Sequence, residues 1–572
     1  MFKNNLKWYD YILMLVVVGF IVLQVYFEME LIEYMAELAF KVRVGSSVSS
    51  IWDTGKIMLL NATLIMVTII ISSSISAMIS TKFGASLRAN IFKKVNSFSQ
   101  EEINKFSTAS LITRSTNDVT QVQNTMQMAL RMMILSPTMA IFSIVKVVNS
   151  SIQLSWATAI AVIIMFALFI ALFIMVVPAF SKLQKSTDKI NLVSRENLTG
   201  IRVIRAYNTE KEQEEKFNKV NGDLSKLHYY TGKVMSLMSP AMNMIFNGLT
   251  LAIYWMGANL INIGALQYEN IVEFTQYGMH ILMSFMFLSA VIIMLPRGIV
   301  SAKRINEVLT TKSKVVEGSF DGKTSVQGKL EFRNVSFRYP DAEMNILEDI
   351  NFTVNKGETI AFIGSTGSGK SSLVNLIPRF FDASFGEILI DDVNVKEYSK
   401  NALNAKIGFV PQKGVLFRGT VEENVKYGAD NISQEKVWDT LKIAQANFVK
   451  KLDGGLNYEI AQGGTNVSGG QRQRLCIARA IAKDPEIYVF DDSFSALDYK
   501  TDKALRKALA KHTKDATKVI VAQRVGTIMD ADKIIVLDNG KMVGQGTHNE
   551  LLNNCEVYRE IAYSQLSKEE LE

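Results

Sequence analysis

The first part of the chain carries six long apolar runs separated by polar segments. Each run is close to the roughly 20 residues that an α-helix needs to cross a bilayer. The runs span residues 11–27, 57–79, 132–148, 156–177, 242–261 and 271–295. We therefore expect residues 1–309 to form an α-helical transmembrane domain with six spans.

The polar segments between the runs set the expected orientation. Lys3 and Lys7 precede the first run, and the two long connections, residues 81–131 and 179–238, are rich in Lys and Arg. Such residues gather on the cytoplasmic side of membrane proteins. We expect both termini to be cytoplasmic and both connections to continue the spans as long helical extensions below the membrane.

The pattern changes after residue 309. Residues 310–328 are expected to be a linker, and strand and helix patterns alternate over residues 329–572. Short apolar, strand-like runs end at Gln412, Asp491 and Gln523. We expect this part to be an α/β P-loop nucleotide-binding domain.

Composition narrows the function classes only slightly. The net charge of +7 is compatible with nucleic-acid binding, but membrane proteins also gather Lys and Arg in cytoplasmic loops. We favour the membrane explanation and expect no nucleic-acid partner. The two cysteines and four histidines show no spacing typical of a disulfide framework or a metal site. The chemistry must therefore be sought in other motifs.

A phosphate-binding loop is the clearest of these motifs. The segment from Gly364 to Ser371 matches G-x-x-x-x-G-K-[ST] between an apolar strand-like run and a helix-like run. In such loops, backbone N–H groups surround the phosphates, the lysine reaches the terminal phosphates and the hydroxyl ligates Mg²⁺. We expect ATP to contact Gly364, Ser365, Thr366, Gly367, Ser368, Gly369, Lys370, Ser371 and Ser372, with Ser371 as a metal ligand.

A second helix start also faces an anion. Ser468 is a good N-cap, and Gly469, Gly470 and Gln471 follow it. Asp491 ends an apolar strand shortly afterwards, where a second Mg²⁺ ligand beside a phosphate loop is expected. Because one nucleotide does not need two helix N-termini from one domain, we expect a head-to-tail dimer in which the 468–471 segment binds the partner's ATP.

Over nearly its whole length, the chain resembles ABC exporter half-transporters, which fuse six spans to one nucleotide-binding domain. The resemblance implies that Gln412 is the Q-loop glutamine beside Mg²⁺ and that Val467–Gln471 is the signature motif, with Val in place of the usual Leu. It implies a D-loop at Ser495–Asp498. The segments Thr113–Asp118 and Glu196–Glu210 resemble the family's coupling regions.

Tyr339 allows two interpretations. A strand-end aromatic can simply cover the core, whereas the family pattern implies that this ring stacks on adenine. The phosphate loop about 25 residues further along favours stacking.

Two positions depart from the family pattern. The residue after the Walker B aspartate is normally Glu, the base that orients the attacking water, and here it is Asp492. Its carboxylate is withdrawn by about 1.5 Å, and a misplacement of about 1 Å can lower a rate roughly 100-fold. Gln523 stands where the family has the switch histidine. We expect a degenerate site that binds ATP and hydrolyses it weakly.

The resemblance implies an ATP hydrolase and translocase in a bacterial plasma membrane. We expect a subunit that exports hydrophobic or amphipathic compounds such as drugs or lipids, as in heterodimeric multidrug exporters. A heterodimer with a second half-transporter is favoured over a homodimer. Two alternatives stay open: an ATP-gated or regulatory subunit, and an importer on the exporter fold of the siderophore type. Lys146 and Glu273 are the clearest intramembrane charges, and their scarcity disfavours a highly charged substrate.

Overall fold

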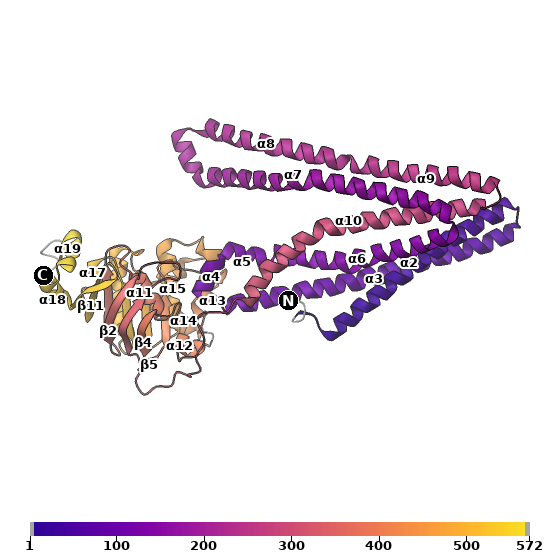
Figure 1. Cartoon of the computed structure of the whole chain (residues 1–572). Coiled ribbons are helices and arrows are strands. Elements are labelled where there is room, and N and C mark those ends of the chain that lie inside the picture. Colours follow the sequence, from indigo (N-terminus) through magenta and orange to yellow (C-terminus); the bar gives the residue numbers. More distant parts are fainter. Residues whose placement is uncertain (1–4, 430, 567–572) are drawn as a thin grey trace. The chain divides into compact units, whose positions relative to one another are not determined.

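The computed structural model describes residues 5–429 and 431–566 (Figure 1). Lys3, used above to orient the chain, lies outside these residues. Contacts divide the chain into two units. The first holds the residues up to Lys94 together with Ala109–Thr310, and the second holds Val95–Thr108 together with the residues from Thr311 onward.

The first unit is built from long helices. They are α2 (Trp8–Arg43), α3 (Val48–Asn96), α5 (Thr108–Ser115), α6 (Asn117–Ser150), α7 (Ile152–Tyr207), α8 (Glu210–Ser236), α9 (Met238–Asn262) and α10 (Tyr268–Thr310). Within the described residues, six helical stretches are long and apolar enough to cross a membrane, so the predicted six spans are confirmed. The helices extend well past the apolar runs, because the polar connections continue them.

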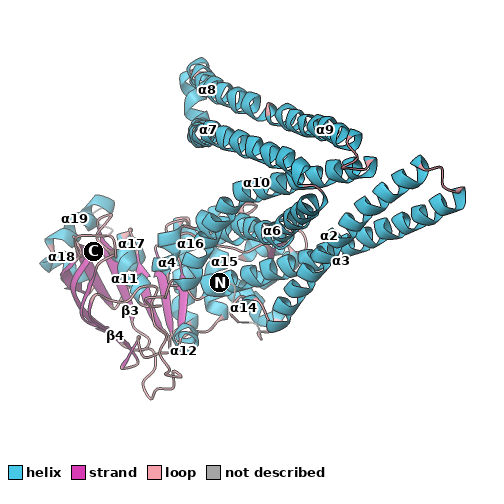
Figure 2. Ribbon diagram, turned by 45° about the vertical axis from the view of Figure 1, so that its right-hand side comes forward, coloured by secondary structure: helices cyan, strands magenta, loops and turns pink. Residues whose placement is uncertain are grey.

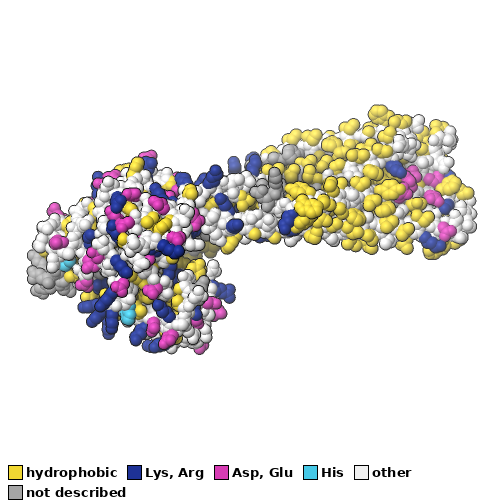
Figure 3. All heavy atoms as spheres, turned by 90° about the horizontal axis from the view of Figure 1, so that it is seen from below, with side chains coloured by type: hydrophobic (Ala, Val, Ile, Leu, Met, Phe, Trp, Pro, Cys, Tyr) yellow, Lys and Arg dark blue, Asp and Glu magenta, His cyan; other side chains and the backbone are white. Residues whose placement is uncertain are grey.

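The surface of these helices is apolar over a broad area (Figure 3). Leu15 and Leu59 are each 71% exposed, and Trp255 is 73% exposed. So much apolar surface in contact with water would be strongly unfavourable, whereas lipid tails solvate it at no cost. Prolines inside α6, α7 and α10 are also tolerated in membrane helices when neighbouring groups satisfy the freed backbone.

Helices α6 and α10 pack along much of their length, and α2 lies against both. The α7–α8 turn lies away from this group in both views (Figures 1 and 2). Close packing is visible at Gly298, where an added Cβ would lie 2.3 Å from Thr125 Oγ1. Nearby, Ser301 Oγ donates a 2.8 Å hydrogen bond to Asp118 Oδ1. Small and polar residues thus hold α6 against α10.

The described residues of the second unit form three sheets. A six-stranded sheet has the order β12 (Lys541–Gly546), β11 (Lys533–Asp538), β3 (Thr359–Gly364), β10 (Thr517–Val521), β9 (Ile487–Asp491) and β6 (Ile407–Val410). A four-stranded sheet has the order β2 (Leu347–Val354), β1 (Leu330–Phe337), β4 (Phe385–Ile390) and β5 (Val393–Asn394). A small sheet pairs β7 (Gly419–Thr420) with β8 (Glu459–Ile460).

Helices cover these sheets. They are α4 (Gln100–Phe106), α11 (Lys370–Leu376), α12 (Lys400–Lys406), α13 (Val421–Lys426), α14 (Gln434–Ile443), α15 (Gly469–Ala482), α16 (Tyr499–His512), α17 (Val525–Ile528), α18 (His548–Asn554) and α19 (Glu556–Gln565). Three short 3₁₀ turns lie at Asn447–Lys451, Gly455–Asn457 and Gln462–Gly464. The predicted α/β class is confirmed for this part of the chain.

The parallel strands bring the predicted site residues to one edge. Strands β3, β10, β9 and β6 are parallel neighbours. Their sequences are almost continuously apolar because both faces are buried, one against helices such as α15 and the other against α11 and the four-stranded sheet. Gly364 and Asp491 end two of these strands, and Gln412 and Gln523 follow the other two within two residues. Ligands of open α/β sheets bind at this carboxyl edge.

The first connection is divided between the two units. Arg114 donates to the Arg304 carbonyl at 2.7 Å and pairs with Glu307 on α10, and Asp118 also contacts α10. The segment Val95–Thr108, which includes α4, groups with the nucleotide-binding unit instead. Thr113–Asp118 therefore anchors membrane-domain helices, and the more N-terminal helix α4 lies on the nucleotide-binding unit.

Candidate nucleotide site

The phosphate loop joins β3 to α11. Gly364 approaches the Leu537 carbonyl so closely that an added Cβ would lie 2.0 Å from its oxygen. Gly369 has a φ of +97°, which L side chains rarely adopt, and it is the N-cap of α11. These two positions require glycine, and they leave backbone N–H groups bare at the start of the helix. The loop therefore has the shape and polarity for phosphate.

Lys370 spans this loop. Its Nζ donates to the carbonyl oxygens of Gly364 at 2.9 Å and Ser365 at 2.7 Å. Burial lowers the pKa of Lys370, and the charges of Asp492 and Asp491 oppose this shift. The lysine is thus held over the loop with its charge close to both aspartates, where terminal phosphates are expected.

Ser371 and Asp491 meet across the sheet edge. Ser371 Oγ donates a 2.9 Å hydrogen bond to Asp491 Oδ1. Burial raises the pKa of Asp491, and the Ser371 hydroxyl partly offsets the rise. A hydroxyl and one carboxylate form the oxygen pair that Mg²⁺ takes from protein when phosphates and water supply its other ligands. The donor set fits the predicted metal position.

Asp492 is held by two glutamines. Gln523 Nε2 donates to Asp492 Oδ2 at 2.8 Å, and Gln412 Nε2 donates to the same oxygen at 3.2 Å. The three side chains come from three different strand ends. The two departures from the family pattern thus contact each other directly, which sequence spacing alone did not reveal.

The backbone of Asp492 is also constrained. Its φ is +45°, a left-handed conformation that Asp tolerates better than most residues. Its N–H donates to the Val521 carbonyl at 3.0 Å, and its own carbonyl accepts from Ser495 Oγ at 2.9 Å. Burial raises the pKa of the Asp492 carboxyl, against the hydrogen bonds from Gln412 and Ser495. The carboxylate is therefore fixed in position rather than free to swing.

Tyr339 lines a cavity of about 290 Å³ together with Phe337, Arg338, Phe381 and Ser384 among others. Its hydroxyl lies 3.0 Å from Ser372 Oγ, directly after the phosphate loop. Its ring meets Phe381 edge-on, with ring centroids 5.3 Å apart. An aromatic ring beside the loop and a cavity is compatible with the predicted adenine stacking.

The signature segment starts α15. Ser468 and Gln471 form a reciprocal capping box, in which the Gln471 N–H donates to Ser468 Oγ and the Ser468 N–H donates to Gln471 Oε1. An added Cβ at Gly470 would lie 3.1 Å from the Ala496 carbonyl oxygen, whereas Gly469 has open space around it. Ser468 and Gly469 are exposed. This helix start is ordered by its own residues and open to a ligand.

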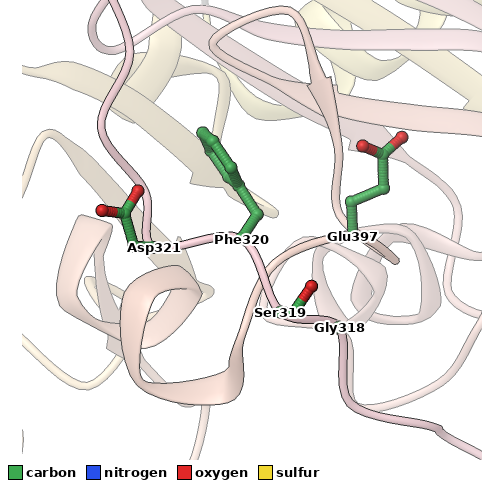
Figure 4. Close-up of a pocket in the computed structure, with 5 residues that line it drawn as sticks. All are labelled: Gly318, Ser319, Phe320, Asp321 and Glu397. Atoms are coloured by element: carbon green, nitrogen blue, oxygen red, sulfur yellow. The ribbon is translucent and has the colours of Figure 1, made fainter.

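A larger pocket of about 550 Å³ lies elsewhere on the unit (Figure 4). It is lined by Gly318, Ser319, Phe320, Asp321 and Glu397, and it includes none of the predicted nucleotide residues. The Phe320 N–H donates to the Glu397 carbonyl at 2.9 Å, so the segment after the membrane domain pairs with the chain beside β5. The pocket forms where these two segments cross, and its lining residues show no arrangement typical of a catalytic site.

Three contacts were not predicted from the sequence. Gln565, on the last described helix, binds the backbone on both sides of Arg524. In the membrane domain, His280 Nδ1 lies 4.0 Å from Glu28 Oε2, and Lys146 pairs with Glu33. The helical pattern carries no signal for such pairs, because their members lie far apart in the sequence.

Fold and site together define a membrane protein that fuses one P-loop nucleotide-binding unit to a helical membrane unit with six candidate spans among the described residues. Residues 347–495 match the family described as ABC transporter, and residues 44–295 match the ABC transporter transmembrane region. The chain belongs to the ABC transporter family and is an ATP-hydrolysing translocase subunit.

Named relatives agree with this assignment. An uncharacterized ABC transporter ATP-binding protein of Mycobacterium tuberculosis is 39% identical over 490 residues, covering 84% of each chain. The uncharacterized ABC transporter ATP-binding protein YfiB of Bacillus subtilis is 35% identical over 528 residues, covering 91% of this chain and 90% of the relative. A solved bacterial Atm1-family ABC exporter with ATP bound has the same fold, with a TM-score of 0.78 at 22% identity over 96% of this chain and 97% of that one.

Proposed function

We propose that this chain is one half of a heterodimeric exporter of hydrophobic or amphipathic compounds, and that its own ATP site is degenerate. The single observation that carries the proposal is the shared oxygen of Asp492. Both Gln523 and Gln412 donate to Oδ2, at 2.8 Å and 3.2 Å. The residue in the position of the general base is thus engaged by two amides.

This arrangement hinders Asp492 from acting as a base for water. Its Oδ2 already accepts hydrogen bonds from two amides, and a glutamine amide cannot take up a proton as histidine can. A general base must also lie within hydrogen-bond reach of the water, and the short aspartate is withdrawn by about one bond length. Slow hydrolysis at this site follows from both effects.

The remaining residues keep the features needed to bind ATP. In this proposal, Tyr339 stacks on adenine, the loop from Gly364 to Ser372 binds the phosphates, and Ser371 and Asp491 hold Mg²⁺ with Gln412 nearby. When bound, Mg²⁺ would neutralise charge on the terminal phosphates. The site can thus stay loaded with ATP while turning over slowly.

The signature segment supports a partner with an active site. Ser468, Gly469, Gly470 and Gln471 retain an ordered, exposed helix start, so they are fit to complete an ATP site in trans. In a homodimer, such a signature would serve only slow sites. A partner half-transporter with a full set of catalytic residues explains why the signature is intact beside a degenerate site.

The membrane unit supports an apolar or amphipathic substrate. Ion pairs lie near the ends of the spans: Arg43 lies 3.0 Å from Glu269, and Lys146 pairs with Glu33. Paired charges do not select a strongly charged substrate, whereas the apolar helix faces suit hydrophobic compounds. We place both termini in the cytoplasm of a bacterial cell, by the charge of the connections.

Transport in membrane vesicles tests this proposal. The chain is affinity-tagged, purified from its native membrane with any partner, and reconstituted with a fluorescent hydrophobic cation. We expect a second half-transporter to co-purify and ATP-dependent movement to follow. ATP binding without vectorial movement would favour the regulatory alternative and would contradict an exporter.

A further inference from the structure

We infer that Gln565 is a positioning residue for ATP hydrolysis, because it fixes the loop that carries Gln523. The inference rests on the proposed role of Gln523 as the switch residue. Gln565 Nε2 donates to the Gln523 carbonyl at 2.8 Å, and Gln565 Oε1 accepts from the Val525 N–H at 2.8 Å. One side chain thus binds the backbone on both sides of Arg524.

Among the described residues, the Gln523 carbonyl and the Val525 N–H have no backbone partner within a sheet or a helix. The sheet pairing of β10 ends at Val521, and the N–H of Ala522 donates to the Phe362 carbonyl as the last such bond. Helix α17 then begins at Val525, and its N-cap, Arg524, makes no side-chain capping bond. Helix starts need acceptors for their first N–H groups. Gln565 supplies one from another helix.

Helix α19 is a firm base for this contact. Tyr558 and Ala562 are both fully buried and lie one turn apart on one face. Gln565 follows Ala562 by three residues and therefore continues that face at the helix end. The Tyr558 hydroxyl also lies 2.6 Å from His548 Nδ1, which ties α19 to α18. The position of Gln565 is thus set by packing.

The contact reaches the proposed base through one further bond. Gln565 holds the backbone of Gln523, and the Gln523 side chain donates to Asp492 Oδ2 at 2.8 Å. Since an amide donor must be placed within a few tenths of an ångström to keep such a bond, holding the backbone holds the donor. The end of α19 therefore positions the switch residue without touching nucleotide.

The first test measures hydrogen exchange of the Val525 amide in the full-length transporter. Gln565→Leu removes both bonds at similar size, and Ser564→Ala removes only a hydroxyl that bonds its own helix, at the Ile561 carbonyl. A hydrogen bond worth about 1 kcal/mol corresponds to roughly fivefold in local opening. We expect the Val525 amide to exchange about fivefold faster in Gln565→Leu and unchanged in Ser564→Ala. Unchanged exchange in Gln565→Leu would overturn the inference.

The second test measures nucleotide hydrolysis at this chain's own site alone. Azido-ATP is photocrosslinked to this chain, and its conversion to azido-ADP is followed over time. We expect Gln565→Leu to change the conversion rate several-fold with unchanged labelling affinity, and to have no further effect in a Gln523→Ala background. The same change in both backgrounds, a loss of labelling affinity, or no change in rate would each contradict a positioning role.

These measurements can refute the degenerate site and the positioning role of Gln565 independently of each other. Fast conversion by the unmodified chain would contradict a degenerate site, yet dependence of the Gln565→Leu effect on Gln523 would still establish the positioning role. Slow conversion that is insensitive to Gln565 would leave the degenerate site intact and remove only the present inference.

Discussion

The candidate nucleotide site of this chain and its signature segment both lie at helix starts of the same α/β unit, but their polar groups make different hydrogen bonds. In the nucleotide site, Asp492 Oδ2 already accepts from Gln412 and Gln523. In the signature segment, Ser468 and Gln471 cap each other and leave the helix start exposed. The first arrangement restrains the carboxylate that we propose as the base, and the second leaves a helix start open to a ligand.

In the proposed heterodimer, loss of function in one half of a composite site need not extend to the other half. The proposal assigns Asp492 and Gln523 to nucleotide bound to this chain, and Ser468 to nucleotide bound by a partner. Substitutions on each side should therefore have different consequences, and the following experiments use that difference.

The largest effect is expected for Ser468→Ala. Loss of one preorganised donor to a phosphate-like transition state costs about 100-fold in rate, so the ATPase activity of the assembled transporter should fall by about that factor. Ser433→Ala is the matched control, because Ser433 caps α14 with the same type of bond, to the Lys436 N–H at 3.2 Å. Equal losses in both variants would show that helix stability, and not the signature, is responsible.

Lys370→Ala should weaken ATP binding at this chain's own site. Hydrogen bonds to charged groups are worth about 1.5–3 kcal/mol, which corresponds to roughly 10- to 100-fold in affinity. Photolabelling with azido-ATP measures the change, and Asp492→Ala serves as comparison because residue 492 acts on water. Loss of labelling in Asp492→Ala, with labelling preserved in Lys370→Ala, would reverse the assigned roles.

The next experiment restores the residues that the family pattern has at positions 492 and 523. The double variant Asp492→Glu with Gln523→His extends the carboxylate and removes one amide from its oxygen. We expect hydrolysis at this site to rise by about tenfold or more, because base placement within about 1 Å decides such rates. Azido-ADP formation on this chain measures the rise, and Asp492→Glu alone should give less. No rise in the double variant would mean that other groups limit the site.

The smallest effect is expected at helix α4. Glu102 accepts from the Ser99 hydroxyl at 2.6 Å and from the Lys314 N–H at 3.1 Å. Burial alone would raise the pKa of Glu102, but these hydrogen bonds outweigh it and the pKa lies below the ordinary 4.5. A carboxyl with a lowered pKa stabilises the folded state above its ordinary pKa, and this contribution is lost as the pH falls through the folded value.

Glu102→Gln should therefore lower the midpoint of thermal unfolding of the nucleotide-binding unit by a few degrees at neutral pH, with little difference from the unmodified chain at the acid end. Glu101→Gln is the matched control, since Glu101 pairs with the exposed Lys314 side chain. A penalty for Glu102→Gln that stayed constant down to acid pH would contradict the role of the ionised carboxylate.

Much of the fold was predictable because its signals are local. Apolar runs of membrane length predicted the six spans. Strand-like runs ending at Gln412, Asp491 and Gln523 predicted the strands of the α/β unit that carry these residues. The loop from Gly364 to Ser371 was predictable because its glycines answer local steric demands, as the close approach of Leu537 to Gly364 shows.

The rest depended on contacts between distant residues. The shared hydrogen-bond oxygen of Asp492 joins three strand ends, and no spacing in the sequence encodes which atom accepts. The placement of Arg114 and Asp118 against α10 likewise arises from tertiary packing. Gln565 is an ordinary exposed helix residue by sequence, and only the fold brings it to the loop at Gln523.

The proposed asymmetry between the two ATP sites is tested most directly by the ATPase activity of the assembled transporter. The transporter is purified from its native membrane through a tag on this chain, and Asp492→Ala is compared with the unmodified protein. The account predicts that most of the activity remains in Asp492→Ala, because hydrolysis takes place at the partner's site, which Ser468 completes. A homodimer whose transport-coupled hydrolysis collapses in Asp492→Ala would contradict it.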